Sequence, residues 1–335
     1  MPTANIWDDE GFTLESLTAA VNREPYRPGQ VSATGIFNED GVTTTLVSIE
    51  EREGKLALVE PTKRGGPGET TDDDVRNRIP FEVDHYQRDD SVKADEVQNV
   101  RAFGSEDRLE TLTERVESKA QRHAADLTMT LEHQRVGAIK GIVTAKSGTV
   151  LHNLYTRFGI AEPAAVSLEL DVEATDVGAL WQDVVYSVED DLDEPYDGLH
   201  VFTGRDFHRR MWRHKSIRET FVFQDAQVLR QDVPDVFTFG GATWERYRTG
   251  ARATTDLGSP YIGNNDARVV PVGVPDLFIT RFAPADYEET VNTVGLPFYA
   301  KQWARADGKG RHLQVQMNAI SLCTRPGVLR KLTLT

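Results

Sequence analysis

The sequence of 335 residues predicts an α+β fold in which extended segments project from a body built around one long helix. Three observations predict it. Two extended runs, the first rich in β-branched residues, flank a Gly-rich charged segment, one apolar stripe recurs at helical spacing, and the C-terminal half alternates short strands with Gly/Pro turns. The apolar share of 39% is low for a globular protein, which indicates a subunit with a large surface relative to its core.

Residues 1–42 are predicted to form an arm that needs a partner surface to become ordered. A short amphipathic stretch runs from Phe12 to Leu17, after which Pro25, Pro28 and Gly29 interrupt any helix. The first residues lack a basic start and an apolar run, so we expect no secretory signal there.

Residues 43–103 predict a long β-hairpin. The extended runs Thr43–Val59 and Arg78–Tyr86 flank Lys63–Asp74, a segment of turn formers and charges that cannot pack a core. Its glycine-rich part, Gly65–Thr71, lacks the lysine of a phosphate-binding loop and precedes no helix, so a hairpin tip is favoured. A two-stranded hairpin is marginally stable alone, so we expect it to lie on a neighbouring subunit.

Residues 105–139 predict one long helix. Ser105 is a good N-cap residue, and Glu106 and Asp107 place negative charge in the first turn. The apolar stripe consists of Leu109, Leu112, Val116, Ala120, Ala124, Leu127 and Leu131. At ~1.5 Å per residue the helix would be roughly 50 Å long. The stripe lasts for only about three heptads, so a helix lying on a sheet is favoured over a coiled coil.

The remaining sequence predicts a compact mixed half. We expect a hairpin over 140–155 that turns at Lys146–Gly148, helices over 174–188 and 204–214, a strand over 199–203, a helix starting at Pro284–Glu289, and a strand over 312–323. In the last of these, alternate apolar residues share one face.

The charge balance excludes several classes of protein. With 38 Lys and Arg against 53 Asp and Glu, the net charge of −15 argues against generic binding to a phosphate backbone. It also repels like copies at long range, so any assembly should depend on salt.

The sequence has no run of 18 apolar residues, so no membrane span is predicted. The single Cys323 excludes an intrachain disulfide and is expected to be a buried structural thiol.

The sequence lacks the usual motifs of catalysis and metal binding, so no catalytic, cofactor-binding or metal-binding residue is predicted. A hydrolase with scattered carboxylates stays open as an alternative, because motifs alone cannot exclude it.

Two charged clusters invite a functional interpretation. Arg205–Lys215 is basic with interleaved aromatics, which suits nucleic acid, but the favoured interpretation is a helix that buries Phe207 and Met211 and turns its basic side towards an acidic neighbour. Glu189–Glu194 with Asp197 lacks the spacing of a calcium loop, so a solvated acidic loop is favoured. An alternative hypothesis is that this loop faces the basic helix of an adjacent copy.

Four stretches together resemble the lambda-type phage major capsid proteins, the capsid protein E family. They occur in family order: His133–Gly141 with Ser147–Val150 and Leu154–Ile160; Phe237–Arg248; Phe282–Thr293; and Gln314–Ala319 with Cys323–Pro326. Each is moderately specific alone, and the first 100 residues match by character rather than by motif.

The resemblance implies the HK97-like capsid fold. Carried onto this sequence, that fold gives an N-terminal arm (1–42), an extended β-hairpin loop (43–103), a peripheral domain (104–174) with its spine helix (105–139), an axial domain (175–311), and a C-terminal strand returning to the peripheral domain (312–335).

The implied function is that of a structural major capsid protein. It would self-assemble into hexamers and pentamers of an icosahedral shell that encloses double-stranded DNA without sequence-specific binding. The implied partners are scaffolding, decoration and portal proteins, and the implied locations are the virion and, during assembly, the host cytoplasm. Some relatives crosslink a loop lysine to an asparagine, but nothing in the sequence supports pairing Lys55, Lys63 or Lys93 with Asn318. Another virion component, such as a tail-tube protein, is the alternative.

Overall fold

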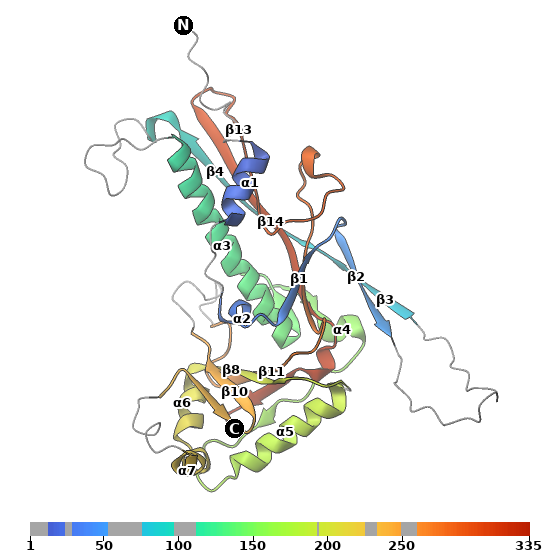
Figure 1. The fold of residues 1–335 in the computed structure, drawn as a ribbon, viewed down its shortest axis with the longest axis vertical. Helices are drawn as coiled ribbons and strands as arrows, with labels where there is room; N and C mark the ends of the chain where they lie inside the picture. Colours follow the sequence, from blue (N-terminus) through green and yellow to red (C-terminus); the bar gives the residue numbers. More distant parts are fainter. Residues whose placement is uncertain are drawn as a thin grey trace, which may run out of the picture.

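The computed structural model describes residues 13–23, 29–52, 76–96, 112–192, 194–224, 233–248 and 260–335. Figure 1 shows an elongated molecule with the long helix α3 (Leu112–Lys140) in its upper part and a compact helix-and-sheet region below. The predicted helix over 105–139 is confirmed from Leu112 onward, and 105–111 lie outside the described residues.

A five-stranded sheet supports the upper part. Its central strand is β14 (Gly310–Cys323), which pairs antiparallel with β4 (Asp84–Lys93), β13 (Tyr299–Ala304) and β12 (Phe278–Phe282). Strand β1 (Phe37–Gly41) extends the sheet by parallel pairing with β12. The predicted strand over 312–323 is therefore confirmed.

Helix α3 lies on this sheet through the predicted apolar stripe. Val116, Ala120, Leu127 and Leu131 are at most 5% exposed and pack with alternate residues of β14. Leu313, Val315, Met317 and Ala319 are the β14 side chains in this cluster. Burial of one face of each element explains why a weakly apolar sequence still holds a long helix in place.

Part of the predicted arm packs on the body of its own subunit, whereas the sequence predicted that the arm needs a partner surface. Helix α1 (Leu14–Arg23) buries Leu17 and Val21 against α3 and β13. The single turn α2 (Gln30–Ala33) and strand β1 follow it onto the same body. Apolar side chains spaced four apart were sufficient for this packing, although proline interrupts the segment between α1 and α2.

The predicted hairpin is present as β2 (Leu46–Arg52) and β3 (Arg76–Glu82), paired antiparallel, while its tip over 63–74 lies outside the described residues. The expected single strand over 78–86 divides at Val83. β3 stays with β2, whereas β4 joins the five-stranded sheet, because Asp84–Ala319 opens a ladder of ten pairs along β14.

The lower region contains a six-stranded mixed sheet. Its order is β7 (Val166–Ser167), β15 (Arg330–Thr333), β11 (Asp266–Val272), β8 (Gly198–Thr203), β10 (Ala242–Arg246) and β9 (Val236–Phe239). Helices α5 (Val177–Leu192), α6 (Arg205–Arg213) and α7 (Lys215–Gln224) pack into one apolar cluster with alternate residues of these strands, so they cover one face. The chain's last strand therefore lies in this sheet.

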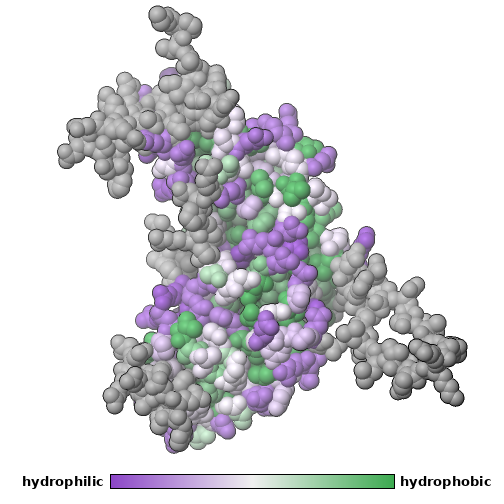
Figure 2. Space-filling model, viewed as in Figure 1, coloured by the Kyte–Doolittle hydropathy of each residue, from purple (hydrophilic) through white to green (hydrophobic). Residues whose placement is uncertain are grey.

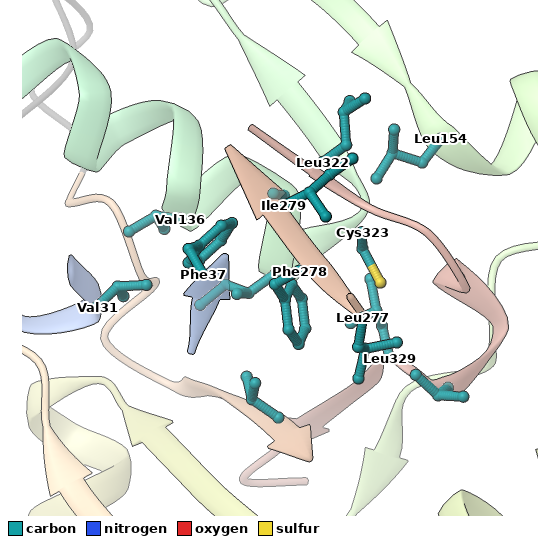
Figure 3. Packing of buried hydrophobic residues seen from close by; sticks show 14 of the residues in the cluster. Val31, Phe37, Val136, Leu154, Leu277, Phe278, Ile279, Leu322, Cys323 and Leu329 are labelled. Carbon is teal, nitrogen blue, oxygen red and sulfur yellow. The ribbon is translucent and has the colours of Figure 1, made fainter. Parts of the chain in front are cut away.

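A second cluster joins the two regions. It gathers Val31 and Phe37 from the arm segment, Val136 from α3, Phe278 from β12 and Cys323 from β14 (Figure 3). The opposite face of the six-stranded sheet contributes to it through β8 and β11. The arm segment is thus part of the core that holds the upper and lower regions together.

Short elements make up the rest of the described secondary structure. They are the hairpin β5 (Ile142–Thr144) and β6 (Val150–Asn153), helix α4 (Leu154–Phe158), and 3₁₀ turns at Ala94–Glu96, Glu288–Thr290 and Pro326–Val328. The predicted hairpin over 140–155 is confirmed. The predicted helix at Pro284–Glu289 is wrong, because only one 3₁₀ turn forms there and the Thr290 hydroxyl donates to the Ala285 and Tyr287 carbonyls.

Candidate assembly surfaces

The β2–β3 hairpin projects from the side of the body (Figure 1). Its two faces differ because side chains alternate along a strand. Val47, Ile49 and Phe81 are at most 8% exposed and pack on the body. On the opposite face Leu46 is 57% exposed. One face of the hairpin is therefore anchored on the body, and the other face is accessible to another protein.

An exposed apolar loop follows the turn at Glu288–Thr290. Val291, Val294 and Leu296 are 65%, 58% and 43% exposed. Figure 2 shows hydrophobic side chains at the surface in this region. Contiguous exposed apolar residues are typical of surfaces that contact other proteins.

A buried carboxylate on α3 ties three parts of the molecule together. Glu132 is 4% exposed, and its Oε1 accepts hydrogen bonds from the Val31 amide (2.9 Å) and the Tyr247 hydroxyl (3.1 Å). Its Oε2 accepts from the Ser32 amide (3.0 Å) and hydroxyl (2.6 Å). One side chain thereby links the arm segment, the long helix and the segment that follows β10.

Further polar side chains near the C-terminal end of α3 are also buried and paired. The Arg135 guanidinium donates to Glu39 of β1 at 2.6 Å. The Gln134 amide donates to the Tyr86 hydroxyl (2.8 Å) and to Asp84 (3.1 Å), and that carboxylate lies 3.1 Å from Nε2 of His152. Burial and the negative charge of Asp84 raise the pKa of Tyr86 above its ordinary value. The end of the long helix is therefore a junction between elements.

The sequence patterns did not predict this junction. The predicted stripe describes one apolar face, whereas almost every residue from Leu131 to Ile139 is buried. Charged residues in such a stretch look like a solvated face when only one sequence is read. One feature of the sequence indicated it: near the end of the helix, the polar residues do not recur at the spacing that would place them on one face.

The basic segment adopts the favoured structural arrangement. Phe207 and Met211 are fully buried in α6. Arg210 pairs with Asp171, and Arg209 lies 3.0 Å from Asp206. His208 is also buried, and burial lowers the pKa of its imidazole.

The acidic segment forms the end of α5 and the loop after it rather than a separate loop. Asp191 pairs with Arg330, and Glu194 lies 2.9 Å from Arg325. Within the described ranges, no group of three or more His, Cys, Asp or Glu side chains could hold a metal ion. Two of its acids thus serve ion pairs within the chain.

Cys323 is buried, and burial raises the pKa of its thiol to about 12.

The Asn318 amide donates to the Pro284 carbonyl at 3.0 Å, and its oxygen lies 2.6 Å from Nδ1 of His85. Lys93 pairs with Gly310, eight positions along β14 from Asn318. Lys55 and Lys63 fall outside the described residues, as does the Gly-rich segment 65–71.

The part of the chain that the structure describes contains no helix long and apolar enough to cross a membrane.

Comparison with known proteins identifies the class of this chain. The phage major capsid protein E family matches residues 13–334. The chain is 22% identical over 350 residues to the major capsid protein of Salmonella phage Felix O1, with 95% of each chain covered. It is 27% identical to that of Pseudomonas phage KPP10, with 96% of each covered.

Solved structures share the fold. A prophage protein of E. coli CFT073 assigned as a capsid protein aligns with a TM-score of 0.59 at 11% identity, covering 97% of this chain and 99% of that one. The mature capsid of bacteriophage PhiM1 aligns with a TM-score of 0.51 at 12% identity, covering 89% and 85%. The chain belongs to the phage major capsid protein E family: it is a structural subunit of a tailed-phage capsid with the HK97-like fold, not an enzyme and not a tail-tube protein.

Proposed function

We propose that copies of this chain form hexamers and pentamers that close into an icosahedral shell around packaged double-stranded DNA. Membership of the capsid family supports assembly from repeated copies. Rings closed by rotational symmetry use each interface once per subunit, so weak contacts add to a stable shell. A net charge of −15 suits a wall that encloses DNA without gripping it or reading its sequence.

We further assign roles to the segments. Residues 1–42 act as the arm, 43–103 as the extended loop, 104–174 as the peripheral domain around the spine helix, 175–311 as the axial domain, and 312–335 as the return to the peripheral domain. The five-stranded sheet under α3 and the six-stranded sheet below it support a division into two domains. The sheets do not follow the assigned bounds throughout, because β12 and β13 lie in the upper sheet and β15 lies in the lower one. The arm would contact neighbouring subunits only through residues other than those of α1, α2 and β1, because these elements pack on the body of their own subunit.

Scaffolding, decoration and portal proteins are proposed as partners, with assembly in the host cytoplasm before the subunit becomes part of the virion. The support for these partners is the family resemblance. Exposed apolar residues of this chain, such as Val291 and Val294, form a surface that these partners or further copies can contact.

The observation that carries the proposal is the projecting hairpin. Its buried face fixes β2 and β3 to the body, while Leu46 is presented to solvent at 57% exposure beside Ser48. A strand pair held in this way reaches beyond its own subunit, where a neighbouring copy can cover it.

A variant at the exposed face tests this role. Leu46→Asp should leave the thermal unfolding of the isolated subunit unchanged but reduce the yield of shells or rings at least tenfold, because a buried charge would oppose the contact. Sedimentation velocity and negative-stain electron microscopy measure the yield. Ser147→Asp, at the exposed β5–β6 turn, is the matched control.

Two results would contradict the proposal. If the natural chain stays monomeric at every salt concentration, even with its scaffolding protein present, assembly itself is excluded. If Leu46→Asp assembles as well as Ser147→Asp, the hairpin is not the contact.

A further inference from the structure

Helices α6 and α7 carry a group of exposed cations. Arg213, Lys215 and Arg218 are exposed and line one hollow, and none has an ion pair with another described residue. We call these three residues the basic face. A cluster of exposed positive charges contrasts with a chain that has 15 more acids than bases.

Helix α5 presents the opposite charge. Asp183, Tyr186, Glu189 and Asp190 are exposed and recur at steps of three and four, so they form one outward stripe. We call these four residues the acidic face. Glu189 accepts a hydrogen bond from the Tyr196 hydroxyl, whereas Asp183 and Asp190 have no ion pair within the described chain. Tyr186 is 55% exposed, and tyrosine is enriched at protein interfaces.

The two faces lie on different helices of one helical layer. α5, α6 and α7 cover the same face of the six-stranded sheet. Figure 1 shows α6 and α7 at the left of this layer and the C-terminal part of α5 at its right. A subunit with complementary surfaces on two sides joins copies head to tail, and such contacts close into rings when the rotation allows it.

We propose that the acidic face of α5 in one copy pairs with the basic face of α6–α7 in the next copy around each capsomer ring. This inference rests on the proposed assembly into rings. Acids among the cations argue against DNA as the ligand: Asp171, Glu173 and Glu219 line the same hollow as Arg213 and Arg218. A phosphate backbone would be repelled by them, whereas a protein surface of mixed charge can match them.

Reversing the charges on either face should prevent assembly. Lys215→Glu/Arg218→Glu makes both faces acidic, and Asp183→Lys/Asp190→Lys makes both basic. We expect each variant to lose at least tenfold in the yield of rings at low ionic strength, because like charges then meet at every contact. High salt should restore part of the yield in both.

The variant that carries all four substitutions is the matched control. It exchanges the signs of the two faces and keeps the net charge of −15, since the two pairs change the charge by equal and opposite amounts. Each contact again joins an acidic to a basic face, so ring formation should recover. Circular dichroism and thermal unfolding of each variant exclude loss of folding as the cause of a defect.

Mixing the two defective variants gives a sharper test. A favourable contact then requires the two variants to alternate, which a ring of six allows and a ring of five does not. An equal mixture should therefore recover hexamers but not pentamers, giving flat sheets or tubes in place of closed shells under the electron microscope.

The outcomes separate this inference from the proposed function. If the natural chain forms no rings, the assembly proposal fails first. If it forms rings and both paired variants do so equally well, the inference is wrong. It is also wrong if the fourfold variant folds but does not recover, or if the basic-face variant assembles normally and loses only DNA retention.

Discussion

At the scale of single residues, the most informative positions are polar groups enclosed by the core. A buried charge is tolerated only where partners replace water, so each one records which segments must stay together. Glu132 of α3 is one such group, and the half-buried Lys140 at the end of the same helix donates to the Tyr261 carbonyl, at the point where the long helix meets the arm segment and the lower sheet. Substituting either residue tests how much this junction contributes to the free energy of unfolding of the subunit, independently of assembly.

Glu132→Gln should lower the free energy of unfolding by about 2–3 kcal/mol, because an amide nitrogen replaces an oxygen that accepts hydrogen bonds. The exchange of the Val31 and Ser32 amide protons should accelerate at the same time. Chemical denaturation and hydrogen exchange measure the two effects. Glu117→Gln, exposed on the same helix, should change neither. Unaltered exchange at Val31 and Ser32 would show that the carboxylate does not hold the arm segment.

Lys140 predicts a dependence of stability on pH. Burial and the nearby Arg268 lower the pKa of its ammonium group from 10.5 to about 8 in the folded chain. Between these values the unfolded chain binds more protons, so this group's contribution to stability rises as the pH increases from about 8 to 10.5. The gain amounts to ~3 kcal/mol at 1.4 kcal/mol per unit of pKa.

The comparison that isolates this effect is with Lys140→Met. The natural chain should gain about 3 kcal/mol relative to this variant between pH 8 and pH 10.5, measured by urea unfolding. Lys309→Met removes one charge at an exposed turn and serves as the control. A difference between Lys140→Met and the natural chain that stays constant over this range would refute the prediction.

At the scale of elements, the regular patterns of the sequence were sufficient for the long helix, the hairpins and the central strand. The stripe through Val116 and Leu131 and the alternation along β14 both follow from burial of one face. The 3₁₀ turn at Glu288–Thr290 and the docking of α1 could not be read in the same way. The docking of α1 depends on contacts with residues distant in the chain, such as Phe298 and Val315. The 3₁₀ turn depends on the Thr290 hydroxyl, which donates to the Ala285 and Tyr287 carbonyls.

Gly137 tests the packing of α3 on the β5 strand. An added Cβ would lie 2.8 Å from Cα of Val143, too close without a backbone shift. Gly137→Ala should therefore destabilise the subunit by about 1–3 kcal/mol, although alanine favours a helix over glycine by ~1 kcal/mol. Gly178→Ala in α5, where the nearest atom belongs to the flexible Asp176 side chain, should be neutral or stabilising. Thermal unfolding distinguishes the two, and a stabilised Gly137→Ala would disprove the close packing.

At the scale of the whole molecule, the family motifs and the order of elements predicted the fold class and the capsid role. They did not predict that the arm segment joins the core that links the two sheets, because Val31 and Phe37 read as isolated apolar residues in a proline-interrupted stretch. Nor could one sequence show which charges already pair within the subunit. Arg210 and Asp191 do so, which leaves Arg218 and Asp190 for a neighbouring copy.

Strand β14 has a mechanical consequence. It pairs with β4 over ten positions, with β13 over six and with β12 over five, and each hydrogen bond runs across the strand. Tension applied along the strand axis would load these bonds in shear, so that many must break together, whereas a hairpin pulled apart at its ends opens one pair at a time. The subunit should therefore be stiffest along β14, and a stretched wall should yield at contacts between subunits before the five-stranded sheet does.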